Sequence, residues 1–247
     1  MTAFDENKNI KWLFCLTHPD DDVFIGAWIR RLSEIGCEVH LSWTHDNSIR
    51  RAEARHAARL FKIPPDRLHF QGGSDGKICD DLKGLIVPFS AMIEAIKPDR
   101  VVCGAFEHGH IDHDSTNFLV SQVFNGPIFE TPYYHTYCTK LQTMCRLAEP
   151  SGAEVRALDK AEKQFKWDLL ACYPSQNLGR ILKWYPWLQL LRFKDRDVFR
   201  FEELRLQDKL DYRRPNVPST LAQKVLASPQ WQRWLAAINA FESDQAK

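Results

Sequence analysis

The sequence has no long apolar run. No stretch of about 18 consecutive apolar residues occurs among its 247 residues, so no transmembrane helix is expected. The charged start from Met1 to Lys8 has no apolar core, so no signal peptide is predicted. The seven cysteines are scattered without a C-x-x-C pair, and Cys15 and Cys103 lie in apolar segments. These absences favour a soluble cytoplasmic protein with reduced thiols in its core.

The sequence also lacks an excess of charge of one sign. Its 33 basic and 32 acidic residues nearly cancel, so no global field favours nucleic acid as a partner. No internal repeat or low-complexity linker divides the chain, and 247 residues suit one α/β domain. We therefore expect a single domain over residues 1–247. It would have a core at about 10–180 and a C-terminal extension at about 181–247 that packs on or covers the functional site.

The apolar segments that are present alternate between strand and helix patterns. Strands are predicted at 11–16, 38–44, 67–70 and 100–106, with helices between them at 23–32, 48–61 and 81–96. This rhythm indicates a Rossmann-like, mostly parallel sheet flanked by helices. Two further strands are expected at 133–137 and 142–148, antiparallel at the edge of the sheet, and a helix is expected at 158–172. One or two helices are expected at 219–241, with Trp231 and Trp234 against the body.

A cluster of one imidazole and three carboxylates follows the first predicted strand. It reads Thr17-His18-Pro19-Asp20-Asp21-Asp22. In a tight turn, His18 and Asp21 can converge on one ion while Asp20 points at what that ion holds. Mixed nitrogen and oxygen ligands of this kind suit a hydrolytic Zn²⁺. The alternative is a helix cap with a solvated acidic first turn.

A second cluster, rich in histidine, follows the fourth predicted strand. It runs from Glu107 to Ser115, and its His110 and His113 are spaced to share one face of a turn. Open α/β sheets bind ligands at the carboxyl ends of their strands, where both clusters lie. One of these two histidines can complete a three-ligand site with His18 and Asp21, leaving a position open for water.

At these residues the chain resembles a known family, the PIG-L or LmbE-like zinc-dependent N-acetylglucosaminyl deacetylases. The family's motifs A-H-P-D-D-E and H-x-D-H correspond to residues 17–22 and 110–113. The likeness covers about residues 10–180. It continues through Thr44-His45-Asp46, Arg50-x-x-Glu53, Phe70-x-Gly-x-x-Asp75-Gly76 and a K…Y-x-S-Q pattern at Lys166, Tyr173, Ser175 and Gln176.

The resemblance implies a role for each matching residue. One Zn²⁺ would be bound by His18, Asp21 and His113. Asp20 would be the general base, taking one proton and later returning it to the amine. The remaining catalytic pair would be His110, which stabilises the oxyanion while protonated or as a strong donor, and Asp112, which orients or charges it.

Substrate contacts are expected from three further positions. Arg50 would contact the substrate, as the arginine of the family's R-x-x-E motif does, although a basic helix face in solvent explains the other arginines of that helix. Asp75 can belong to an Asp-Gly turn or contact a sugar hydroxyl. His108 stands where some relatives carry a tyrosine that assists the oxyanion. The chain also has Thr17 and Asp22 where the family has Ala and usually Glu.

The segment 178–194 is aromatic and basic. We interpret it as a lid or packing segment over the sheet. The alternative is a membrane-surface contact for a lipid-linked sugar, against which Pro186 argues because it interrupts a continuous amphipathic helix.

The expected function is hydrolysis of the N-acetyl or other N-acyl group of an N-acetylglucosamine-type amino sugar, free or linked to a nucleotide, a thiol or a lipid. A metal-dependent sugar-nucleotide glycosyltransferase is the first alternative, but such sites use Asp with Mg²⁺ or Mn²⁺ more than paired histidines. A catalytically silent sugar-binding relative is the second, and Asp20 argues against it.

Overall fold

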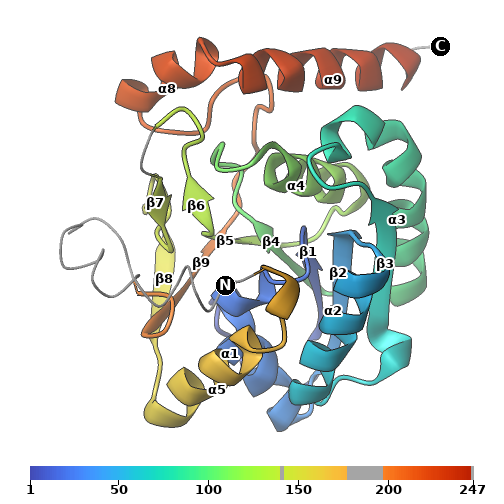
Figure 1. Ribbon diagram of the computed structural model, residues 1–247, viewed down its shortest axis with the longest axis vertical. Coiled ribbons are helices and arrows are strands. Elements are labelled where there is room, and N and C mark those ends of the chain that lie inside the picture. Colours follow the sequence, from blue (N-terminus) through green and yellow to red (C-terminus); the bar gives the residue numbers. More distant parts are fainter. Residues whose placement is uncertain (140–141, 177–196, 246–247) are drawn as a thin grey trace.

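A seven-stranded sheet forms the centre of the protein. The computed structural model describes residues 1–139, 142–176 and 197–245, and its sheet has the order β3-β2-β1-β4-β5-β9-β8 (Figure 1). The first five strands in this order are parallel, while β9 is antiparallel to both β5 and β8. The strands are β1 (Lys11–Leu16), β2 (Glu38–His45), β3 (Leu68–Gly73), β4 (Arg100–Gly104), β5 (Ile128–Thr131), β8 (Ala153–Ala157) and β9 (Phe201–Leu206). The predicted α/β class is confirmed.

Helices cover both faces of the sheet, and side chains of β1 alternate between the two cores. Trp12 and Phe14 belong to one core, and Leu13 and Cys15 to the other. A strand buried on both faces explains the continuous apolar run of β1. The first core includes residues of α1 (Asp22–Ile35), α2 (Ser48–Leu60) and α5 (Lys160–Leu170); the second includes residues of α3 (Leu82–Ile96), α4 (Ile111–Val123), α8 (Ser219–Leu226) and α9 (Pro229–Gln245). Across the described ranges, no helix has both the length and the apolar character that crossing a membrane requires.

The later strands differ from the prediction. The segments 133–137 and 142–148 do not lie at the edge of the main sheet, because β6 (Tyr134–His135) and β7 (Thr143–Met144) form a separate antiparallel pair. The edge is formed instead by β8, with β9 between it and β5, and the sequence patterns revealed neither strand. β9 carries buried charge: Glu202 is paired with Lys166 at 2.9 Å. Because a buried position of β9 holds the charged Glu202, neutralised by Lys166, this strand lacks the apolar pattern of a core strand.

The C-terminal prediction of one or two helices is confirmed by α8 and α9. Trp231 and Trp234 are residues of α9, and their side chains are fully buried in the second core. The predicted lid or surface segment at 178–194 lies outside the described residues.

The order of the sheet places two loops side by side. β1 pairs with β2 on one side and with β4 on the other. From β1 the chain proceeds outward to β2 and β3, and from β4 it proceeds outward to β5, in the opposite direction. The carboxyl ends of β1 and β4 therefore form the switch point of the sheet, where doubly wound folds bind their ligands.

Candidate active site

The loop after β1 turns Asp21 away from its expected capping role. Asp21 occupies the N-cap position of α1, but its side chain caps no amide of that helix. Its Oδ2 instead accepts hydrogen bonds from the backbone N–H groups of Thr17 (3.1 Å) and His18 (2.8 Å). This holds the carboxylate over the end of β1, with Oδ1 directed toward α4. The helix-cap alternative is therefore wrong for Asp21.

The loop after β4 contributes His113 to the same point. This histidine lies in the first turn of α4 and is buried. Its Nε2 lies 3.2 Å from Nδ1 of His18 and 3.4 Å from Oδ1 of Asp21. Of the two histidines that the sequence left open, His113 is the one that meets both Asp21 and His18.

The donor atoms of His18, Asp21 and His113 fit a divalent metal. All three ligand atoms lie within 4.8 Å of one another. A tetrahedral zinc with bonds of 2.0 to 2.1 Å requires neighbouring donors about 3.3 Å apart, close to the 3.2 and 3.4 Å found here. Three ligands from two loops also match the number that catalytic zinc sites take from the protein.

The charges around His18 favour a cation. Burial lowers the pKa of His18, but Asp112, Asp75, Asp21 and Asp20 together raise it to about 10. The ring would therefore carry a proton because the surrounding carboxylates attract positive charge. A metal ion bound by Nδ1 supplies that charge in the place of the proton.

Asp20 lies beside these residues and is paired with Arg50. The guanidinium of Arg50 donates to Oδ1 of Asp20 and also lies 3.4 Å from Glu53. Burial and the charge of Asp21 raise the pKa of Asp20, although Arg50 opposes the shift. Burial alone would raise the pKa of Asp21, but the charges of His113 and His18 outweigh it and lower the pKa to about 2. The two adjacent carboxylates thus have opposite shifts, and Asp20 is the one more easily protonated.

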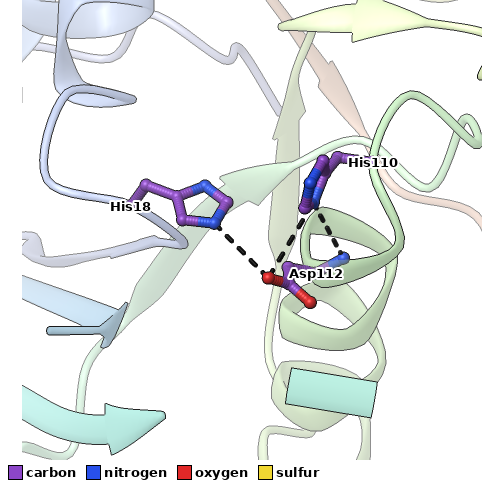
Figure 2. A group of neighbouring side chains, drawn as sticks. All are labelled: His18, His110 and Asp112. Carbon is purple, nitrogen blue, oxygen red and sulfur yellow. Dashed lines mark hydrogen bonds and ion pairs between the residues drawn. The ribbon is translucent and has the colours of Figure 1, made fainter. Parts of the chain in front are cut away.

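His110 and Asp112 face His18 from the start of α4 (Figure 2). His18, His110 and Asp112 also form a possible metal-binding group. Both oxygens of Asp112, however, already accept backbone N–H groups, from Gly76 at 2.6 Å and Ile78 at 3.2 Å. Its Oδ2 lies 3.5 Å from Nε2 of His18. This is the place of a carboxylate that orients a ligand histidine through its second nitrogen.

The expectation of a raised pKa at His110 is wrong. Burial and the charges of His113 and His18 lower the pKa of His110, and the opposing effect of Asp112 is smaller. The two side chains are 3.9 Å apart, because Asp112 is turned to the loop that follows β3. Nδ1 of His110 accepts the N–H of Asp112 as the cap of α4, at 3.2 Å. The neutral ring therefore carries its proton on Nε2.

A search of curated proteins gave no match. A comparison with protein families, in contrast, gave a family match.

Residues 13–124 match the PIG-L family.

That family is described as GlcNAc-PI de-N-acetylase, and the match contains the three candidate ligand residues together with Asp20 and His110. The resemblance predicted from the two motifs is confirmed. The PIG-L match supports a deacetylase enzyme.

Solved structures of deacetylases share the fold. The N,N'-diacetylchitobiose deacetylase of Pyrococcus horikoshii is 20% identical, with a TM-score of 0.58 over 88% of this chain and 91% of its own. A deacetylase of teicoplanin biosynthesis is 15% identical, with a TM-score of 0.57 over 81% and 100%. The zinc-inhibited form of teicoplanin deacetylase Orf2 is 16% identical, with a TM-score of 0.55 over 81% and 100%. These deacetylases thus share the mostly parallel α/β fold of this chain.

Two of the three predicted substrate contacts reach the candidate site. Asp75 is 69% exposed, and its Oδ1 lies 3.3 Å from Nε2 of His18. Arg50 is buried against Asp20, so its first function is to hold that carboxylate. Asp75 is therefore open to a ligand, whereas Arg50 is largely covered.

The prediction that His108 contacts the substrate is wrong. Its side chain is fully buried, and its Nδ1 lies 3.2 Å from Asp114. Its Nε2 accepts the backbone N–H of Asn216 at 3.0 Å, and its ring packs edge-on against Phe106 and Trp231. Both nitrogens are used within the protein, so this histidine fastens the loop after β4 to the C-terminal segment.

Tyr134 is a candidate site residue that the sequence analysis missed. Its ring lies 5.2 Å from that of His113. Burial and the charges of Asp21, Asp20, Asp112 and Asp75 raise the pKa of its hydroxyl, which therefore stays protonated. The backbone oxygen of Tyr134 lies so close to Gly109 that a Cβ there would overlap it, which explains the glycine directly before the second motif. No local pattern marks Tyr134, because it enters the site from a short strand outside the main sheet.

Proposed function

We propose that this protein is a zinc-dependent N-deacetylase of an N-acetylglucosamine-type amino sugar or its conjugate. The observation that carries the proposal is the meeting of His18, Asp21 and His113 at donor separations of a tetrahedral site, with Asp20 beside them and unused as a ligand. One zinc ion per chain is proposed. When bound, Zn²⁺ would lower the pKa of a coordinated water to about 7 and polarise the amide carbonyl.

Asp20 is proposed as the general base. The attacking water gives its proton to the Asp20 carboxylate, and the same proton passes to the amide nitrogen as the carbon–nitrogen bond breaks. The products are acetate and the free amine. A base that must also release its proton benefits from a raised pKa, and burial beside Asp21 raises that of Asp20. Arg50 fixes the orientation of the carboxylate through Oδ1.

His110 is proposed to donate Nε2–H to the carbonyl oxygen as negative charge develops on it. Its Nδ1 is committed to the N–H of Asp112, so the donor nitrogen is fixed without a positive charge on the ring. Asp112 is proposed to position His18 and the loop after β3 rather than to charge His110.

Asp75 and Arg50 are proposed to recognise the sugar, with Asp75 as the exposed acceptor for a hydroxyl. The P. horikoshii neighbour is named for N,N'-diacetylchitobiose and the other neighbours for teicoplanin, while the family description names GlcNAc-PI. For this protein we propose an acetylated glucosamine as the group that is deacetylated. The glycosyltransferase alternative is not supported, because the family match and the paired histidine ligands both point to hydrolysis.

An amine-release screen tests this function. Zinc-loaded protein is incubated with N-acetylglucosamine, N,N'-diacetylchitobiose, a UDP-linked, a thiol-conjugated and an inositol-lipid-linked N-acetylglucosamine, and the primary amine is measured. We expect at least one substrate to be deacetylated by the wild type and none by Asp20→Asn. Equal amine release by both proteins, or none by the wild type, would contradict the proposal.

We expect His110→Ala to lower kcat by about 10²-fold or more, the effect of losing one oxyanion donor. Zinc should remain bound, because three other residues are the proposed ligands. The measurement is kcat together with zinc per chain. If the variant loses its zinc instead, His110 and His113 have exchanged ligand and donor roles.

Tyr134→Phe tests the second possible donor. Because its protonated hydroxyl is near the site carboxylates, we expect its loss to lower kcat by about tenfold, less than a full oxyanion donor at ~10²-fold. The rings of Tyr and Phe pack alike, so the thermal midpoint should not change. Normal turnover in Tyr134→Phe would exclude the hydroxyl from the reaction.

A further inference from the structure

The loop that follows β3 carries the exposed carboxylate of the site. It includes Asp75 and Gly76, continues to Ile78, and leads into the short helical turn Ile78–Asp81. Gly76 has φ +69°, a conformation that side chains with a Cβ rarely adopt, so the loop makes a tight reversal there. The N–H groups of Gly76 and Ile78 point inward to Asp112, at 2.6 and 3.2 Å.

The outer side of this loop is held by an arginine of the C-terminal helix. Arg233 of α9 donates from Nε and Nη2 to the two oxygens of Asp80, at 3.0 and 2.6 Å. Its Nη2 also donates to the carbonyl of Gly76 at 2.8 Å. The hydrogen bond from Arg233 lowers the pKa of Asp80, so both partners stay charged. Gly76 is thus bonded to Arg233 through its carbonyl and to Asp112 through its N–H.

We propose that Arg233 is a positioning residue of the active site, which fixes the Asp75 loop from α9. The inference rests on the proposed deacetylase function and adds a residue more than 100 positions beyond the family match, which ends at 124. Arg233 touches neither the proposed metal ligands nor the reacting atoms. It acts through Gly76, and through that residue on the position of Asp75 opposite His18.

The two carboxylates beside Gly76, those of Asp112 and Asp75, depend on Arg233 to different degrees. Asp112 is fully buried in α4 and keeps its place through that helix. Asp75 is 69% exposed and lies next to Gly76, so the loop itself sets where its carboxylate lies. Loosening the loop should therefore weaken sugar binding more than the chemical step.

Arg233 is a suitable residue to test because its contribution to overall stability is small. Its side chain is 41% exposed and that of Asp80 is 52% exposed, and exposed ion pairs contribute little to folding. The chain offers a matched control in Arg213, which is 46% exposed and bonds to two residues of α9, Asn239 at 2.6 Å and Glu242. Arg213 has no bond to the Asp75 loop among the described contacts.

The first experiment measures amide hydrogen exchange in zinc-loaded wild type, Arg233→Ala and Arg213→Ala. We expect exchange at Gly76 and Ile78 to be about tenfold faster in Arg233→Ala only, because residues in one hydrogen-bond network are coupled. Exchange in β1 and β4 and the thermal midpoint should be unchanged. Equal exchange at Gly76 in all three proteins would overturn the inference, and so would faster exchange throughout Arg233→Ala, which indicates a general stabilising role.

The second experiment measures kinetics on the best substrate of the amine-release screen. Arg233→Ala should raise KM about threefold to tenfold with kcat within about twofold, and Asp80→Ala should do the same without adding to it in the double variant. Arg233→Lys should recover part of the loss, and Arg213→Ala should behave as wild type. A lowered kcat with unchanged KM would overturn the assignment. If the wild type deacetylates no sugar, the proposed function fails while the exchange experiment still decides the role of Arg233.

Discussion

Asp20→Asn is expected to lower kcat by about 10²-fold to 10⁴-fold, the typical contribution of a general acid or base, while the protein keeps its zinc. Asn has nearly the size of Asp and can still accept a hydrogen bond from Arg50, so the local packing is retained. It cannot take a proton from water. Asp20 is not one of the proposed ligands, and the donors of His18, Asp21 and His113 remain in place. The measurement is kcat on the best amino-sugar substrate, together with zinc per chain.

The matched control is Asp5→Asn. Asp5 also pairs with an arginine, Arg100 at the amino end of β4, at 2.6 Å. That end of the strand is opposite to the site, so the control should retain wild-type turnover. Turnover close to wild type in Asp20→Asn would exclude Asp20 as the base, and loss of zinc in that variant would make it a ligand.

His18→Ala and His113→Ala are each expected to abolish stoichiometric zinc binding and turnover together. Each substitution removes one of three proposed protein ligands, and the two that remain do not make the three-ligand arrangement of a catalytic site. Wild type should bind about one zinc per chain and each variant much less. The measurement is metal content after dialysis against buffered zinc.

His69→Ala is the control for the loss of a histidine as such. His69 lies on β3 and contacts His40, at 3.1 Å between ring nitrogens, away from the metal residues. The His69→Ala variant should bind zinc as wild type does. Full zinc occupancy in both His18→Ala and His113→Ala would contradict the ligand assignment.

The candidate metal site could be predicted because its signals are local. Each cluster directly follows an apolar strand, and the parallel order of the sheet then brings the ends of β1 and β4 together. Sequence spacing alone left His110 and His113 as alternatives. The structure separates them, because His110 is used as the cap of α4 while His113 lies one turn further and faces Asp21.

The residues that could not be predicted depend on contacts between distant segments. His108 is close to the second motif in sequence, but a bond from Asn216 removes it from the site. Tyr134 and Arg233 approach from elements that carry no motif. The raised pKa expected for His110 fails because burial and the charges of His113 and His18 outweigh the effect of Asp112, whose carboxylate is turned toward Gly76.

The central claim is that amide hydrolysis requires a metal held by His18, Asp21 and His113. The most direct test is acetate release from the best N-acetylated amino sugar by chelator-stripped protein during a zinc titration, comparing wild type with His113→Ala. We expect no release before zinc is added, recovery in the wild type that is complete at about one equivalent per chain, and no recovery in His113→Ala. Release that persists after the metal is stripped, or that zinc restores equally in both proteins, would contradict it.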